Sequence, residues 1–145
     1  MAQQTALALW LLALLMFPGE VRTVVSRPVV PVRGQATFYG RGVMERVYAN
    51  RLAMGDVDPC GDCVDFVAMR LRSDVGRRVM IRYAGVVYGP FLVVDCAAPR
   101  DLGLMVARRR VVEVSWEQAA AWGMTGPVEV ELMPSADGNP GFGGY

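Results

Sequence analysis

The sequence predicts a small, mostly β domain that closes into a six-stranded barrel and carries one short helix. Three observations lead to this fold class. About 100 residues lie between a proline-rich extended segment and a tail rich in glycine and proline. Within them, short runs of apolar, β-branched and aromatic residues recur, each ended by glycine or polar turn residues, and a single capping box marks one helix. About six strands suit a small closed barrel, and we expect them at residues 35–39, 64–69, 78–83, 86–88 continuing into 91–94, 111–114 and 128–132.

The composition bounds both the size and the chemistry of the protein. The chain has 145 residues, 53% of them hydrophobic, which is enough for one domain with its own core. Its net charge is only +1 and all 15 basic residues are arginines, so bulk charge gives no case for a nucleic-acid partner. Histidine is absent, which excludes imidazole catalysis and the commonest zinc ligand. We therefore expect no metal and no cofactor, and any chemistry must depend on carboxylates, tyrosine or cysteine.

An apolar run occupies residues 5–17 and is followed at once by Pro18 and Gly19. Its length fits the hydrophobic part of a signal peptide but falls short of the roughly 20 residues that a membrane-spanning helix needs. No positive residue precedes the run, and Val24-Val25-Ser26 is the candidate cleavage site. An uncleaved anchor and a buried N-terminal helix are the alternatives. Export predicts a secreted, periplasmic or cell-surface location, with membrane contact only through an uncleaved N-terminal segment.

Proline and glycine set the expected domain boundaries. Residues 1–26 are assigned to the signal peptide or anchor, and residues 27–33 to an extended linker because each proline disfavours helix at the residue before it. The folded domain is expected at 34–133, and residues 134–145 have too little apolar content to pack. We expect a monomer.

The one expected helix begins after Ser115. Ser115 with Gln118 three residues later forms a capping-box pattern, and good helix formers follow it as far as Trp122. Gly123 is the expected helix end, and Met124 stands where the apolar contact after a glycine cap is found.

The order of these pieces resembles a known family. The segments that carry the resemblance are Gly34-Gln-Ala-Thr-Phe-Tyr-Gly40, Val79-x-Ile-x-Tyr83, Gly89-Pro-Phe-x-Val-Val-Asp95 and Val112-Glu-Val-Ser-Trp-x-x-Ala-Ala-x-Trp-Gly-Met124. In order and spacing they resemble the rare lipoprotein A (RlpA) family within the expansin and barwin-like superfamily. The resemblance covers residues 34–132.

The resemblance implies a six-stranded double-psi β-barrel with a surface groove. Better-known members of that family bind or cleave the glycan strands of peptidoglycan. The chain is accordingly expected to bind a cell-wall polysaccharide, with lytic transglycosylase activity as a further candidate. Asp95 falls on the family's catalytic-type aspartate, and Glu113 on an acidic position that more often has a structural role.

Two family polar groups are missing from the chain. Met69 stands in place of a histidine, and Tyr48-Ala-Asn-Arg51 lacks the family's glutamate. These departures bear on the activity more than on the fold, so whether the protein is an enzyme is left open.

Asp95 is the first candidate for catalysis. It ends an apolar run, so its carboxyl group is expected at a barrel rim beside hydrophobic surface, where desolvation favours a general acid. One such group can protonate the leaving oxygen of a glycan and then accept a hydroxyl proton. Asp101 is a weaker candidate for a second carboxylate. The alternatives for Asp95 are glycan contact without catalysis, and acceptance of backbone N–H bonds in the following loop.

Aromatic side chains are the candidate sugar-stacking groups. Tyr39 is the first choice because the resemblance places it in the groove, and Phe91 and Tyr88 are the further candidates. For Trp116 and Trp122, packing of the helix is favoured over a role in binding.

Three cysteines in an exported protein indicate one disulfide and one remaining thiol. The resemblance to expansin-like and barwin-like chains favours a disulfide between Cys96 and either Cys60 or Cys63. A Cys60–Cys63 redox pair, a metal site completed by Asp62 or Asp65, and three reduced thiols are the alternatives.

Two function classes follow from these observations. The first is an exported glycan-binding domain, with or without lytic activity. The second is a non-catalytic structural or protein-interaction module on the same barrel. An aspartic-protease-like use of the barrel ranks lower, because one Asp strand per chain would require a dimer. The arginine run at 108–110 is interpreted as a solvated loop, with attraction to an anionic polymer or membrane surface as the alternative.

Overall fold

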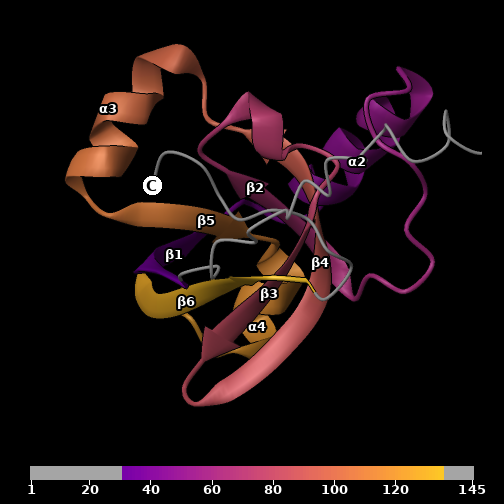
Figure 1. The fold of residues 1–145 in the computed structure, drawn as a ribbon. Helices are drawn as coiled ribbons and strands as arrows, with labels where there is room; N and C mark the ends of the chain where they lie inside the picture. The colour runs from indigo at the N-terminus through magenta and orange to yellow at the C-terminus, as the bar shows by residue number, and fades with distance from the viewer. Residues whose placement is uncertain (1–30, 136–145) are drawn as a thin grey trace, which may run out of the picture.

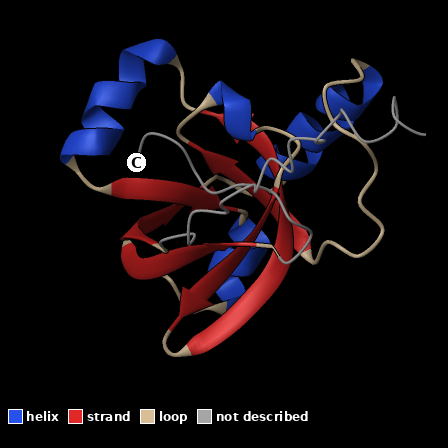
Figure 2. Ribbon diagram, in the orientation of Figure 1, coloured by secondary structure: helices blue, strands red, loops and turns tan. Residues whose placement is uncertain are grey.

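The computed structural model describes residues 31–135, which form a closed six-stranded β-barrel with few helices (Figure 1, Figure 2). The strands agree with those expected from the sequence to within a few residues at each end. They are β1 (Val32–Phe38), β2 (Asp65–Met69), β3 (Arg78–Tyr83), β4 (Val86–Cys96), β5 (Arg110–Val114) and β6 (Val128–Pro134). The predicted signal peptide or anchor, most of the predicted linker and nearly all of the predicted tail lie outside the described residues.

The barrel closes in the strand order β1-β5-β2-β4-β3-β6. The pairs β1–β5 and β2–β4 are parallel, and the other four are antiparallel. The sheet is therefore mixed, and its first strand pairs with its last two. Closure leaves no sheet edge exposed.

Alternation along the strands separates two apolar clusters. One face of the strands fills the barrel interior with Val67, Val79, Phe91, Val93, Leu132 and their neighbours, which are fully buried. The other face of β2 and β4 contributes Ala68, Leu92 and Val94 to a second cluster, which also holds Met44. Because successive side chains of a strand point to opposite faces, this second cluster lies outside the barrel, under the helix that contains Met44.

Within residues 31–135, three α-helices and one 3₁₀ turn surround the barrel. They are α2 (Val43–Ala53), η1 (Arg72–Asp74), α3 (Pro99–Ala107) and α4 (Trp116–Ala121). In Figure 1, α3 stands to the left of the barrel and α2 to the right, while α4 lies lower.

The helix expected after Ser115 is confirmed as α4. The Ser115 hydroxyl accepts a hydrogen bond from the Gln118 backbone N–H at 2.9 Å and donates to the Asp65 carboxylate. At the other end Gly123 has a φ of 67°, and the Met124 N–H donates to the Ala119 carbonyl at 2.9 Å. Both ends thus satisfy backbone groups that a helix terminus leaves without partners.

The other two α-helices were not expected from the sequence. α2 follows Gly42, whose φ is 68°, and no side chain caps it. α3 begins with Pro99, which suits the first helical position because proline lacks the N–H that would be unpaired there. Both helices matter for function, since each brings side chains to the end of β4.

None of the helices described between residues 31 and 135 has the length and apolar character required to span a bilayer.

Candidate functional site

A pocket of about 400 Å³ lies where β4 ends and α3 begins. Its polar lining includes three carboxyl groups, from Asp95, Asp101 and Glu113, together with Tyr39 and Arg110. Leu104 and Met105 of α3 form an apolar part of the wall, and Cys96 also lines it. The volume falls within the roughly 300–1,000 Å³ typical of small-molecule sites.

Strand register explains why residues distant in sequence meet at this pocket. Ala68 on β2 pairs with Glu113 on β5 and with Asp95 on β4, while Thr37 on β1 pairs with Glu113. These four positions therefore form one row across the sheet. With strands about 4.8 Å apart, the backbones of Asp95 and Glu113 are separated by roughly 10 Å.

A β-bulge sets the direction of Asp95. The register between β2 and β4 shifts after Val67, so that Val67 pairs with Val93 but Ala68 pairs with Asp95. β4 thus has one residue more than β2 at this point, a device that re-aims side chains beside functional sites. Val94 belongs to the outer cluster with Ala68, and the bulge allows Asp95 to reach groups on the same side.

Arg51 of α2 is the charged partner of Asp95. Its Nη2 lies 3.2 Å from Asp95 Oδ1, and its Nε donates to the Val94 carbonyl at 3.2 Å. Its Nη1 lies 2.8 Å from Asp56 Oδ2, which Arg72 approaches to 3.0 Å. Arg51 therefore ties the end of β4 to the loop after α2.

This network shifts the protonation of its members. The hydrogen bond to Asp56, opposed by desolvation and supported by Asp95, raises the pKa of Arg51. Hydrogen bonds from Arg51 and Arg72 lower the pKa of the Asp56 carboxyl below its ordinary value. Both groups stay charged at neutral pH, so Asp95 faces a permanent positive charge on the Arg51 guanidinium.

Tyr39 brings a neutral donor to the two carboxylates. Its hydroxyl donates to Asp95 Oδ2 at 3.5 Å, and the Glu113 carboxylate also lines the pocket beside it. Burial, followed by the negative charges of Glu113 and Asp95, raises the pKa of Tyr39 far above its ordinary value. Because a phenol has one proton, it can donate to only one of the carboxylates at a time.

At the end of the row away from Asp95, Glu113 and its neighbours are also polar. The Thr37 hydroxyl donates to Glu113 Oε1 at 3.0 Å. Arg110, at the start of β5, has a buried Nε–H that finds no acceptor within residues 31–135. A buried donor without a partner is costly, and an acceptor on a bound ligand is one way to satisfy it.

The structure brings together three of the residues selected from the sequence, namely Asp95, Tyr39 and Asp101. Asp101, in the first turn of α3, has a side chain that is 56% exposed and stands at the pocket rim. The hydrogen bonds to the Asp95 carboxylate within residues 31–135 come from side chains, Tyr39 and Arg51, and its own side chain is 23% exposed. Within the described residues, the Asp95 carboxylate is therefore not occupied by backbone N–H donors, which was the structural alternative.

Two aromatic candidates lie elsewhere. Phe91 was expected beside a glycan, but its side chain is fully buried in the barrel interior and contacts Trp122 edge-on. That expectation is wrong, because the residue alternates inward with Val93. Tyr88 is partly buried against the same cluster, its ring is tilted by 58° against that of Trp122, and it does not line the pocket.

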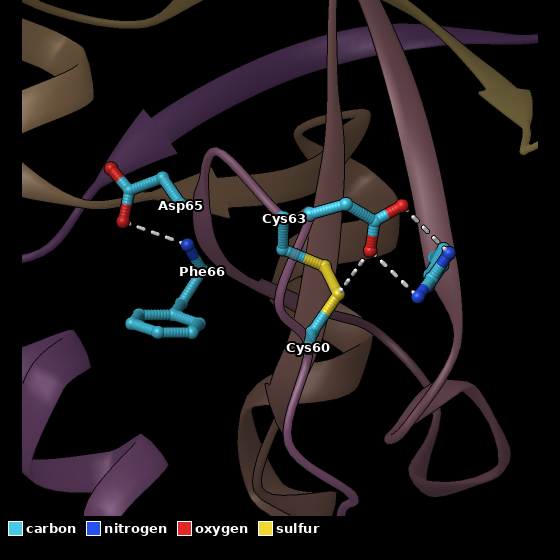
Figure 3. Close-up of a disulfide and its surroundings, with 6 residues drawn as sticks. Cys60, Cys63, Asp65 and Phe66 are labelled. Atoms are coloured by element: carbon cyan, nitrogen blue, oxygen red, sulfur yellow. Dashed lines mark hydrogen bonds and ion pairs between the residues drawn. A yellow bond between two sulfur atoms is a disulfide. The ribbon is translucent and has the colours of Figure 1, made fainter.

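The expected disulfide of Cys96 is also wrong. Cys60 is joined to Cys63 (Figure 3). Cys96 is a free thiol. Parallel pairing places Asp65 beside Phe91 and Met69 beside Cys96, so Cys63 and Cys96 are near opposite ends of the two strands. Strand β2 alone, from Asp65 to Met69, spans about 13 Å over its four steps, whereas a disulfide needs Cα atoms within about 7 Å.

Sequence reasoning missed the roles of two arginines. The sequence analysis named Arg51 only as the last residue of a segment that lacks the family's glutamate, and Arg110 only as part of a run of three arginines. Of that run, Arg108 and Arg109 are exposed, as expected for a solvated loop, while Arg110 enters β5 and the pocket. The proline at the start of α3 was the one local signal that could have located the helix beside Asp95.

No protein-family model, no curated protein and no solved structure matches the chain.

Proposed function

We propose that the chain is an exported double-psi β-barrel domain of the rare lipoprotein A type that binds a cell-wall polysaccharide in the Asp95 pocket. Peptidoglycan is the first candidate polymer, and lytic cleavage is the proposed activity. The observation that supports this most directly is the solvent-reaching Asp95 carboxylate, held between Tyr39 and Arg51 in a pocket of about 400 Å³.

The barrel itself supports the family part of the proposal. A closed six-stranded mixed barrel with two parallel pairs is consistent with a double-psi topology. The resemblance drawn from residues 34–132 predicts the same fold, and it maps its catalytic-type aspartate onto a residue that lies in a pocket.

The pocket lining suits a sugar. Hydroxyl groups of a sugar can donate to the carboxylates of Asp95, Asp101 and Glu113, and can accept from Arg110. The apolar side chains of Leu104 and Met105 offer a surface for the C–H face of a sugar ring. Polar groups that converge beside an apolar wall are typical of small-ligand sites.

The proposed reaction requires a protonated Asp95 that has left its ion pair with Arg51. In that form Asp95 acts first as acid and then as base. Its proton passes to the glycosidic oxygen as the bond from that oxygen to the anomeric carbon breaks. The carboxylate then takes the proton of a hydroxyl on the same sugar, whose oxygen attacks the anomeric carbon and closes an anhydro ring. Tyr39 stays protonated throughout because its pKa is raised, so it orients the carboxylate without competing for the proton.

One observation favours a non-catalytic module as the second candidate. The Arg51 guanidinium binds Asp95, Asp56 and the Val94 carbonyl together, which is also what a structural clamp between α2 and β4 would do. In that case the pocket would bind a polymer or protein without chemistry.

The test compares the full chain with Asp95→Asn on insoluble peptidoglycan and on other insoluble glycans. The matched control is Asp58→Asn, an exposed aspartate on the loop after α2. Pelleted protein measures binding, and mass spectrometry of the supernatant measures products. Anhydro-sugar products from wild type and the control, lost in Asp95→Asn, would support the lytic enzyme.

The other outcomes divide the remaining hypotheses. Binding without products by all three proteins would reject catalysis and leave a glycan-binding module. Absence of both binding and products on every glycan would reject the proposed function and favour the protein-interaction module.

A further inference from the structure

We propose that the Cys60–Cys63 disulfide is a thiol–disulfide exchange site, separate from the Asp95 pocket. The disulfide lies in the loop between α2 and β2 (Figure 3), and both cysteines are partly exposed. Its proposed partner is a thiol compound or a protein dithiol. Neither cysteine lines the Asp95 pocket, so this site would act independently of glycan chemistry.

The position of the disulfide limits its contribution to the stability of the fold. Only Gly61 and Asp62 separate the two cysteines, so the bond joins two points of one loop and fastens no helix to a strand. Disulfides stabilise chiefly by restricting the unfolded chain, and the restriction is smaller for shorter loops. Cys60 and Cys63 are partly buried where they pack against the edge of the outer apolar cluster, whose fully buried members are other side chains.

The surroundings leave the sulfur atoms open to a partner. Gly61 and Asp62 are exposed, and a methyl group built on Gly61 would meet no atom within 4 Å. Val64, next to Cys63, is 59% exposed.

A charged pair stands beside one of the two sulfur atoms. Asp62 Oδ1 lies 3.4 Å from Cys60 Sγ, and the same carboxylate pairs with Arg78 of β3 at 2.8 Å (Figure 3). Once Cys60 is reduced, its S–H can donate to Asp62, which favours the thiol over the thiolate at Cys60. Arg78 fixes the carboxylate in place for that contact.

The exchange balances as a two-electron reduction. An external thiolate attacks Cys63 Sγ, the S–S bond breaks, and the electron pair leaves on Cys60 Sγ. Cys60 Sγ takes a proton from water, and the resulting S–H donates a hydrogen bond to Asp62 Oδ1. A second external thiolate then attacks the external sulfur of the mixed disulfide. This step releases Cys63 as a thiolate and forms the external disulfide.

The experiment incubates the folded full chain, in a Cys96→Ser background and as wild type, with glutathione buffers of graded ratio. Thiols are trapped by alkylation and assigned by peptide mass spectrometry, and far-UV circular dichroism follows the fold. We expect Cys60 and Cys63 to be reduced together while the fold is kept. Asp62→Asn should raise the rate of reduction by about three- to tenfold, because it removes negative charge that repels the thiolate and disfavours the leaving Cys60 thiolate.

Asp58→Asn is the matched control, and its rate of reduction should equal that of the parent. Three outcomes would overturn the proposal. These are a disulfide that glutathione reduces only after urea unfolds the chain, reduction that abolishes the fold, and equal rates for Asp62→Asn and Asp58→Asn.

Discussion

At the scale of single residues, Tyr39 has the clearest pH signature. Burial and the neighbouring Glu113 and Asp95 charges raise its pKa above the ordinary value of 10.0. The unfolded chain therefore loses the phenolic proton at a lower pH than the folded chain. Its contribution to stability is complete below pH 10 and is lost as the pH rises through the higher folded pKa.

We therefore expect the free energy of unfolding of the wild type to fall as the pH rises above about 10, and to fall less steeply in Tyr39→Phe. Urea unfolding at a series of alkaline pH values measures this. Tyr83→Phe is the control, because the variant should keep the Tyr39 part of the pH dependence. Parallel curves for wild type and Tyr39→Phe would contradict the raised pKa.

The residue scale also shows what the sequence could say about the site. Asp95 could be selected because a lone aspartate ends a long apolar strand, and the family resemblance selected Tyr39. The partners of Asp95 could not be foreseen, because they depend on a bulge in β4 and on a helix with no capping side chain. Phe91 was misplaced because its place in the alternation of β4, shared with Val93, turns it into the barrel. Tyr88 packs partly against the same cluster because the β3–β4 register shifts between the pairs Val79–Phe91 and Ile81–Tyr88.

At the scale of elements, the seam between β1 and β5 depends on Gly34. A methyl group there would lie 2.5 Å from the Arg109 carbonyl oxygen and 2.5 Å from Val111 Cγ1. The carbonyl belongs to the backbone and accepts the Gln35 N–H at 2.8 Å. The clash cannot be relieved without moving this pairing.

We expect Gly34→Ala to lower the free energy of unfolding by about 1–3 kcal/mol, the usual cost of overpacking. Gly126→Ala is the control, since a methyl group at that position meets no atom within 4 Å, and should change stability by less than about 0.5 kcal/mol. Urea denaturation measures both. Equal midpoints for the two variants would show that β1 can shift without cost.

Strands and helices differed in how well they could be predicted. Each strand coincides with a local run of apolar and β-branched residues between turn residues, so all six strands could be located from the sequence. α2 and α3 lack that clarity: Val43–Ala53 buries only Met44, and Pro99–Ala107 buries only Met105. With one fully buried residue each, neither helix shows a broad apolar stripe at helical spacing, which is the signal that would have predicted it from sequence. The disulfide was misassigned for a different reason: the pairing that the family resemblance implies was preferred to a pairing of Cys60 with Cys63, three residues apart.

At the scale of the whole molecule, closure couples the two ends of the described chain. Thr37 on β1 bonds Glu113, 76 positions away, and Arg33 pairs with Glu131, 98 positions away. Such non-local pairing predicts refolding on a millisecond-to-second timescale. Since each strand has two neighbours, the loss of one strand opens the barrel and removes partners from both sides.

This closure predicts a single cooperative opening, which native-state hydrogen exchange can test. The slowest backbone amides of β1, β3, β4 and β6 should share one free energy of opening, equal to that of global unfolding. Leu132→Ala removes a fully buried side chain from β6 and should lower all of these values together by about 2–5 kcal/mol. Val86→Ala, at a position 52% exposed in the β3–β4 hairpin, should lower none of them by more than about 0.5 kcal/mol. If Leu132→Ala lowered protection in β1 and β6 but left the amides of β3 and β4 unchanged, the hairpin would be stable without the closed barrel.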